Sequence, residues 1–381
     1  MSINFPAPSA KIQTPDRLSM SDPRASNRQR TFSRPKQSGM TLVEIMISLL
    51  IGAILLGGVL QIFLSTKQTY RMQEGLSRLQ ENARFAMEFL TNDIRMAGYF
   101  GCLSQVTSIT NTLNNPTSYL INFAIPIQGS EWLTASSTWS PTVDTSIISP
   151  LPGSDVITIR SASPQGVTVT SHPAGNNDQG SGSADLKLSS NLDPGIQNCD
   201  ILVVSDCMRI AIFQVTNFNS ANNNNTVHNV GGACTNPGNA TKALGKNFEN
   251  GEVYRAQNIS YYVRQNSAFV TGALNPPPPS LYRVMNSAAA EELVEGIEQI
   301  QITYGVDTDS DGSADRYLTA NNVADWNNVG SVRINLLAIS MDNFITSQPL
   351  PYTFNGNTIT PNDRRLRRAF SSTIALRNRL R

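Results

Sequence analysis

The stretch QSGMTLVEIMISLLIGAILLGGVLQ, residues 37–61, decides the fold of this chain. The apolar run extends from Met40 to Leu64, and Glu44 is its only charged residue. At about 1.5 Å per residue, this run would form a helix of roughly 37 Å, longer than the hydrocarbon core of about 30 Å. No small-residue cleavage site follows the run, so it differs from an ordinary secretory signal. The pattern favours an uncleaved, single-pass membrane anchor.

The segment before this run is basic and rich in proline and serine. Residues 1–38 carry seven basic side chains against Asp16 and Asp22, which predicts a disordered leader. Because positive charge stays on the cytoplasmic side, the leader should lie in the cytoplasm and the chain after Leu64 beyond the membrane. Translation could start at Met1 or at Met20, since the later start keeps most of the positive charge. The basic residues are Lys11, Arg17, Arg24, Arg28, Arg30, Arg34 and Lys36.

Glu44 is unusual in such a run, because an ionised carboxylate in a membrane segment costs a few kcal/mol and normally has a partner. One interpretation is an acid tolerated near the cytoplasmic interface. A second follows if the chain is cut between Gly39 and Met40. The cut would create an α-ammonium that could pair with Glu44, in the same subunit or in a neighbour, where the dielectric constant is low.

Gly39, the sequence Met40-Thr-Leu-Val-Glu44 and the apolar run together resemble the class III signal of type IV pilins and of type II secretion pseudopilins. The resemblance implies that a prepilin peptidase cuts after Gly39 and that Met40 becomes N-methylated. It also implies that Glu44 helps to dock the subunit into a growing filament.

The helix should continue beyond Leu64 as an amphipathic helix. Apolar residues recur at three- and four-residue steps, and Phe85 and Phe89 should widen this face. Gly98 is a natural stop signal. We therefore expect a leader over 1–39 and a helix over 40–98, of which 40–64 crosses the membrane. The recurring residues are Leu76, Leu79, Ala83, Ala86, Leu90, Ile94 and Ala97.

Beyond residue 99 the pattern changes to short runs rich in β-formers, several of which alternate apolar and polar residues. Residues 99–381 are therefore expected to form a β-rich head outside the cytoplasm. The fold class predicted is α+β, pilin-like, with a long N-terminal helix packed on a mainly antiparallel β head. The predicted strands are 155–160, 166–170, 200–205, 209–216, 258–264, 280–284, 297–304, 332–339 and 368–376.

Three further segments narrow the resemblance to the PilW-type minor pilins, which themselves are similar to the J-type pseudopilin of type II secretion. These segments are residues 82–102, residues 204–216 and residues 365–379, and the likeness spans most of the chain after Gly39. It implies a protein of the bacterial inner membrane, with a periplasmic head, that primes pilus assembly and joins the filament. The implied partners are other minor and major pilins, the prepilin peptidase and the assembly platform. The implied processes are twitching motility, adhesion and DNA uptake.

The four cysteines, Cys102, Cys199, Cys207 and Cys234, form no C-x-x-C pair, and with only two histidines a zinc site is not expected. In an exported chain an even count favours two disulfides. Four cysteines allow three pairings, and a local Cys199–Cys207 bridge is one plausible choice.

The segment from Asp307 to Asp315, DTDSDGSAD, is the strongest candidate metal site. It places carboxylates at positions 1, 3, 5 and 9 of a turn and glycine at position 6, a pattern that suits calcium. The candidate ligands are Asp307, Asp309, Asp311, Asp315 and a backbone carbonyl near Ser313. Leu318 stands where an EF-hand has glutamate, so a solvated acidic turn is the alternative.

An enzyme is not expected. His172 and His228 lie in loop-like segments without an acidic or cysteine partner at a recognised spacing, so they are interpreted as solvated loop residues. The net charge of +1 argues against a dedicated nucleic-acid binder. The cluster from Arg364 to Arg368 is expected to form a solvated strand edge, with Leu366, Phe370, Ile374 and Leu376 on the buried face.

Two non-enzymatic alternatives remain open. The first is a pseudopilin of type II protein secretion, which would have the same kind of leader, cleavage site, glutamate and apolar helix at its N terminus. The second is a membrane-anchored surface adhesin that never joins a filament. Substitution of Glu44 separates the second from a pilin.

Overall fold

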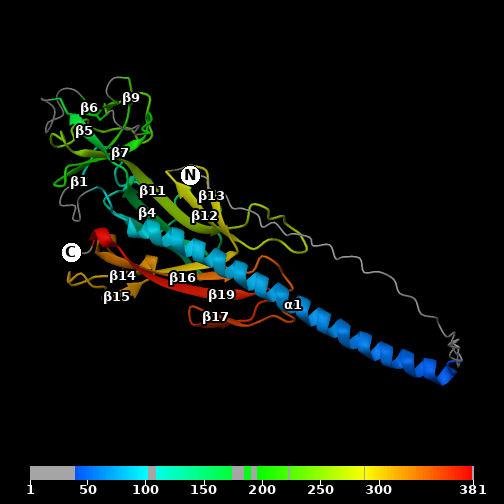
Figure 1. The fold of residues 1–381 in the computed structure, drawn as a ribbon. Coiled ribbons are helices and arrows are strands. Elements are labelled where there is room, and N and C mark those ends of the chain that lie inside the picture. Colours follow the sequence, from blue (N-terminus) through cyan, green and yellow to red (C-terminus); the bar gives the residue numbers. More distant parts are fainter. Residues whose placement is uncertain are drawn as a thin grey trace, which may run out of the picture. The chain divides into compact units, whose positions relative to one another are not determined.

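A computed structural model describes residues 39–101, 109–173, 184–189, 195–221, 224–286 and 288–379. The chain divides into two compact units, Met1–Gln61 and Ile62–Arg381, and each is described by itself. Helix α1, Leu42–Arg95, contributes to both units (Figure 1).

In the first unit, the described residues are the start of α1 and the three residues that precede it, Gly39, Met40 and Thr41. The apolar side chains here are exposed, for example Leu42 at 73% and Leu55 at 64%. The most apolar 18-residue window of α1 has a mean hydropathy of 2.5 and contains no buried residue. By length and composition, α1 is the one helix in the described part of the chain that could cross a membrane.

In the second unit, α1 packs on β-sheet through one stripe of small and branched side chains. Leu79, Ala83, Ala86, Leu90 and Ile94 are at most 2% exposed. They share a core with inward-facing residues of the strands, because the 3.6-residue period brings all five to one side of the helix.

Two aromatic residues and the helix end differ from the sequence prediction. Phe85 and Phe89 are 42% and 37% exposed, so the prediction that they widen the buried face is wrong. The helix ends at Arg95, slightly before the predicted end, and a turn leads to Gly98 at φ +72°. Glycine adopts this left-handed conformation without a steric penalty, which explains the stop there.

The described part of the head contains three sheets, and the fold class is α+β with a mainly antiparallel β head, as predicted. The largest sheet follows the order β1-β8-β7-β11-β5-β6-β10-β9, with β2, β3, β4, β12 and β13 attached off this path. The second sheet has the order β15-β14-β16-β19, and β17 pairs with β18. Among the described pairs, β1 with β8 is parallel and the others are antiparallel.

Each predicted strand overlaps a strand of the structure, although the strand predicted over 258–264 already begins at Glu252, and several short strands were not predicted. The bounds are β1 Ile109–Asn111, β2 Ile127–Leu133, β3 Thr138–Ser140, β4 Val156–Ala162, β5 Val167–Ser171, β6 Asp185–Leu188, β7 Ile201–Ser205, β8 Ile210–Gln214, β9 Asn217–Asn219, β10 Asn225–Val227, β11 Glu252–Arg264, β12 Ser280–Met285, β13 Glu291–Glu295, β14 Ile297–Val306, β15 Arg316–Leu318, β16 Val329–Ile339, β17 Tyr352–Phe354, β18 Asn357–Ile359 and β19 Arg367–Ala375. Short 3-10 turns cover Tyr119–Ile121, Ala320–Asn322, Trp326–Asn328 and Arg377–Arg379.

Candidate functional site

The N-terminal site residues lie at the start of α1. Gly39 and Met40 precede the helix and are exposed. The Thr41 hydroxyl accepts a hydrogen bond from the Glu44 backbone N–H at 3.3 Å, so Thr41 caps the helix. The spacing T-x-x-E is that of a capping box, in which the acid also benefits from the positive end of the helix dipole. Glu44 therefore lies in the first turn of α1, but the return bond of a capping box, from the Thr41 N–H to the Glu44 carboxylate, is not formed among the described residues.

The Glu44 side chain is exposed. Its backbone carbonyl accepts a hydrogen bond from the Ser48 hydroxyl at 2.7 Å. Within the described residues, no group donates a hydrogen bond to the Glu44 carboxylate or pairs with it. The carboxylate is thus available to a cation from outside this part of the chain.

The later part of α1 is held to the head by polar contacts spread along its length. Gln68 Nε2 donates to the Ile345 carbonyl at 2.9 Å, and Asn82 Nδ2 donates to the Glu295 carbonyl at 3.0 Å. Near the helix end, the Tyr261 hydroxyl donates to Asp93 Oδ2. Burial raises the pKa of the Asp93 carboxyl, although the hydrogen bond from Tyr261 opposes this effect. These contacts fix the helix to the largest sheet, because Tyr261 in β11 and Glu295 in β13 both belong to it, and to the loop after β16 that holds Ile345.

The acidic loop connects β14 to β15. Carboxylate oxygens of Asp307, Asp309 and Asp315 lie within 4.8 Å of one another, which is close enough to hold one metal ion. Asp311 is not in this group, and its Oδ1 accepts the Ser313 N–H at 2.7 Å. The structure therefore brings together three of the four predicted carboxylates.

Backbone N–H groups hold two of these acids in place. Asp307 accepts from Gly312 N at 2.9 Å and from Ser310 N at 2.6 Å, and the bond from Gly312 is the main reason why its pKa is lowered. Asp315 accepts from the hydroxyl and the N–H of Thr308, which lower its pKa. Both acids are consequently ionised at neutral pH, as oxygen ligands of calcium must be.

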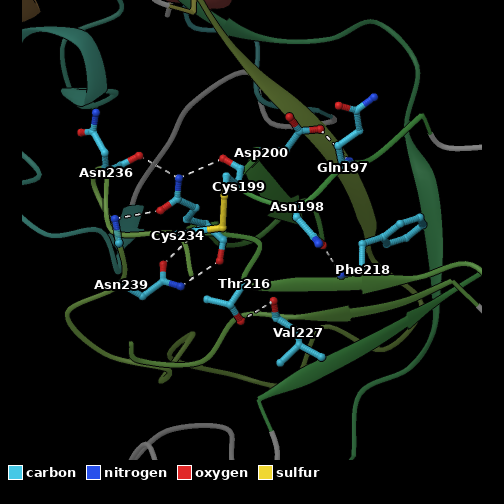
Figure 2. The surroundings of a disulfide bond; sticks show 12 residues. Gln197, Asn198, Cys199, Asp200, Thr216, Phe218, Val227, Cys234, Asn236 and Asn239 are labelled. Carbon is cyan, nitrogen blue, oxygen red and sulfur yellow. Dashed lines mark hydrogen bonds between the residues drawn. A yellow bond between two sulfur atoms is a disulfide. The ribbon is translucent and has the colours of Figure 1, made fainter. Parts of the chain in front are cut away.

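The disulfide of the described chain joins Cys199 to Cys234, with Cα atoms 5.2 Å apart (Figure 2). A local Cys199–Cys207 bridge, one choice that the sequence allowed, is therefore wrong. The Gln214 amide donates to the carbonyls of Cys199 and Asn236, so the bridge lies in a hydrogen-bonded loop cluster. Cys102 lies outside the described residues, and no described cysteine is free.

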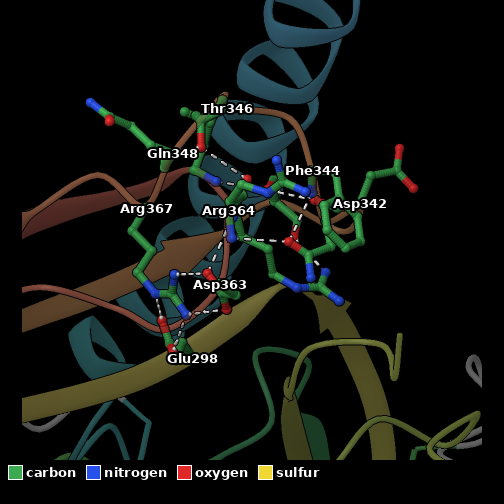
Figure 3. Close-up of polar contacts among 12 residues, drawn as sticks. Glu298, Asp342, Phe344, Thr346, Gln348, Asp363, Arg364 and Arg367 are labelled. Atoms are coloured by element: carbon green, nitrogen blue, oxygen red, sulfur yellow. Dashed lines mark hydrogen bonds and ion pairs between the residues drawn. The ribbon is translucent and has the colours of Figure 1, made fainter. Parts of the chain in front are cut away.

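The arginine cluster at β19 is more buried than predicted. Arg365 is 5% exposed and donates to the carbonyls of Ser340 and Pro276, among others. Arg367 is paired with Glu298 and Asp363 (Figure 3). Burial alone would lower the pKa of Arg367, but its hydrogen bonds to these two carboxylates raise it. The prediction of a solvated strand edge is thus wrong for these two arginines, whereas Ile374 and Leu376 are buried as predicted.

Both histidines are buried, which corrects their interpretation as solvated loop residues. His172 is 3% exposed, and its Nδ1 accepts the Phe248 N–H at 3.0 Å. His228 is 1% exposed and packs on the Phe213 ring, with the ring centroids 4.9 Å apart. Burial lowers the pKa of His228 to about 3, so this imidazole is neutral at physiological pH. Both residues are parts of the core.

Comparison with known families gives two matches. The family of the type IV pilus-assembly protein W matches residues 260–378, which hold the second sheet, the acidic loop and the arginine cluster. The prokaryotic N-terminal methylation motif matches residues 34–60, which include Gly39, Met40 and Glu44. Of the three segments that narrowed the resemblance, residues 365–379 fall almost wholly within the W-type match, and residues 82–102 and 204–216 lie outside both matches. No curated protein and no solved structure matches the chain.

The two matched segments and the fold are mutually consistent. The methylation motif overlaps the start of α1, and the W-type match covers the sheet on which the later part of α1 packs. These two matches support a PilW-type minor pilin of the type IV pilus, with the W-type match covering residues 260–378.

Proposed function

We propose that this chain is cut after Gly39, N-methylated at Met40, and then primes or joins the assembly of a type IV pilus at the inner membrane, with no catalytic role. The observation that carries the proposal is the first part of α1. Its apolar side chains are exposed, and the one carboxylate among them, Glu44, has no partner in the described residues. Such a surface is stable only in lipid or against other apolar helices.

The energetic role of Glu44 follows from its surroundings. In the apolar core of a filament, an unpaired carboxylate would cost about 2.5–3.5 kcal/mol or more. An α-ammonium at Met40 of a neighbouring subunit would remove most of that cost. Subunits placed in the correct register would therefore be favoured over misplaced ones.

Mass spectrometry of the mature N terminus tests the processing step. The expected product begins with Met40 and carries one extra methyl group on its α-nitrogen. A mature protein that retains the residues before Gly39 would exclude the proposal.

Substitution of Glu44 tests the assembly step. Glu44→Ala should leave the protein in the membrane at a normal level but remove it from sheared pili. Glu74→Ala is the matched control, because Glu74 lies on the exposed side of α1 and, among the described residues, pairs with Arg78 alone. Normal incorporation of Glu44→Ala would favour the membrane-anchored adhesin. In a deletion strain, loss of protein secretion with intact pili would favour the type II pseudopilin.

We further propose that the loop between β14 and β15 binds calcium through Asp307, Asp309 and Asp315. The proximity of the three carboxylates supports this, because their mutual repulsion is relieved by a divalent cation. Asp311 and a backbone carbonyl near Ser313 remain candidate additional ligands. The bound ion would stiffen the connection between Tyr304 and the strand that follows Trp326.

A further inference from the structure

Strand β19 forms an open edge of the second sheet. It pairs with β16 along nine residue pairs, from Arg367 opposite Ile339 to Ala375 opposite Ser331. Among the described strands, none pairs with its other side. In Figure 1, β19, drawn in red, lies beside α1.

The hydrogen-bond alternation shows which backbone groups of β19 point outward. Ser340 N donates to the Leu366 carbonyl, and Leu376 N donates to the Gly330 carbonyl. Antiparallel pairs alternate between bonded and non-bonded positions, so the even-numbered residues of β19 bond to β16. The N–H and C=O groups of Ala369, Ser371 and Thr373 therefore face away from the sheet. No described residue bonds to these backbone groups.

Apart from the two arginines at its start, Arg367 and Arg368, this edge lacks the features that usually block strand addition. The outward positions carry small side chains, and β19 contains no proline or lysine. Its register with β16 is continuous, without a bulge. The edge is consequently a regular template for another strand.

A groove of about 680 Å³ lies between this edge and the flank of α1. Met87 and Phe370 supply apolar surface to it, and Phe370 is only half-buried. A strand paired with β19 would lie in this groove and would turn every second side chain toward α1. The groove therefore has both a backbone template and an apolar floor.

The charge of the groove selects the kind of strand. Arg84, Arg95 and Arg368 line it against one acid, Glu88. All four side chains belong to exposed residues, and none forms an ion pair within the described part of the chain. From Met40 onward the chain has 22 basic and 26 acidic residues, a net charge of −4, because seven of its 29 basic and two of its 28 acidic residues precede Gly39. The groove is thus a cationic strip on a chain that is acidic from Met40 onward.

We propose that the outer edge of β19 receives an extended strand of another protein, in which apolar residues alternate with glutamate or aspartate. Backbone hydrogen bonds to β19 would supply affinity, and carboxylates placed beside Arg84 and Arg368 would supply selectivity. A second copy of this chain suits the groove less well, since two β19 edges would bring arginines together. Nucleic acid would satisfy the arginines but would not use the regular spacing of the strand edge. The proposal does not depend on the role in pilus assembly.

The test uses the full mature chain in detergent micelles and a fluorescein-labelled peptide of alternating valine and glutamate. Fluorescence anisotropy should show binding at least about tenfold tighter than for the matching valine–lysine peptide. Addition of the acidic peptide should slow hydrogen exchange at the amides of Ala369, Ser371 and Thr373. A Ser371→Pro variant should lose binding, because proline removes an outward N–H while the bonds to β16 are kept. Ser371→Ala is the matched control and should bind normally.

A double variant, Arg84→Gln with Arg368→Gln, keeps the test decisive if Ser371→Pro fails to fold. It should weaken binding of the acidic peptide about tenfold or more and leave exchange at β16 unchanged. Equal binding of the acidic and basic peptides, protection away from β19, or no binding at about 1 mM peptide would each overturn the proposal. So would an oligothymidine that binds more tightly than the acidic peptide and is unaffected by Ser371→Pro.

Discussion

The hydroxyl of Tyr261, on β11, donates a hydrogen bond of 2.5 Å to Asp93 Oδ2, on α1. The bond joins residues 168 positions apart in the sequence, at the point where the helix is about to end. Burial raises the pKa of Asp93, and burial together with this carboxylate raises the pKa of Tyr261. Docking of the helix therefore partly buries the Asp93 carboxylate, so the stability of the docked helix depends on the protonation of this group.

This coupling predicts a pH dependence of stability. Because the pKa of Asp93 is higher in the folded state than its ordinary value of 3.8, the folded state binds this proton more tightly. The resulting stabilisation is complete below the ordinary value and is lost as the pH rises through the raised pKa. The Asp93→Asn side chain does not titrate, and its amide oxygen can still accept the hydrogen bond from Tyr261. The wild type should lose this stabilisation between about pH 4 and pH 7, and the variant should not. The free energy of unfolding of the variant minus that of the wild type should therefore become more positive over this range.

Denaturant titrations of the full mature chain in detergent, followed by tryptophan fluorescence, measure this difference. Glu81→Gln is the control, since Glu81 lies on the exposed side of α1 and has no resolved role in docking. A difference between Asp93→Asn and the wild type that is constant over this pH range would contradict the coupling.

The buried stripe of α1 predicts a sharp contrast between two leucines one turn apart. Leu79 is 2% exposed within the main core, whereas Leu76 is 37% exposed. Leu79→Ala should reduce the free energy of unfolding by about 2–5 kcal/mol, through lost burial and the cavity it leaves. Leu76→Ala should cost less than about 1 kcal/mol. Equal losses would mean that the helix does not dock as described.

The sequence predicted the elements whose side chains repeat regularly and face one kind of surroundings, either lipid or the protein core. The run from Met40 is apolar on all sides, so its prediction does not require the orientation of the helix. Leu79, Ala83 and Leu90 recur at steps of three and four residues, so they lie on one face of the helix, which is buried. Phe85 and Phe89 were misassigned because hydrophobicity alone does not show where a helix stripe ends. The longer strands alternate over enough residues to be recognised, unlike the three-residue strands β9 and β10, which tertiary contacts create.

Pairings between distant segments could not be predicted in this way. The sequence does not indicate that Cys199 meets Cys234, because the fold of the intervening strands β7 to β10 decides which loops become neighbours. Arg367 appeared to be a surface charge until the fold placed Glu298 beside it. The burial of His172 and His228 has the same origin, since short polar segments around them gave no sign of the core that covers them.

The disulfide provides the next prediction. Cys199 and Cys234 are 35 positions apart, so loss of the bridge should increase the entropy of the unfolded chain and cost about 2–4 kcal/mol of stability. The double variant Cys199→Ala with Cys234→Ala should show this loss in a denaturant titration. Thr235→Ala, an exposed neighbour, is the control and should be nearly neutral. An unchanged free energy of unfolding in the double variant would argue against the bridge.

The acidic loop provides the last prediction, which rests on the cluster of Asp307, Asp309 and Asp315. Calcium at about 1 mM should raise the melting temperature of the mature chain, and magnesium at the same concentration should raise it less, because carboxylate-rich flexible loops suit the larger ion. Asp309→Asn keeps an acceptor for the Asp311 N–H, which lies 3.2 Å away, but removes one charge. This variant should lose most of the calcium shift, yet melt no lower than the wild type without calcium, since repulsion among the acids is reduced. A wild type that melts at the same temperature with and without calcium would leave the loop as an acidic turn held by its own backbone N–H groups.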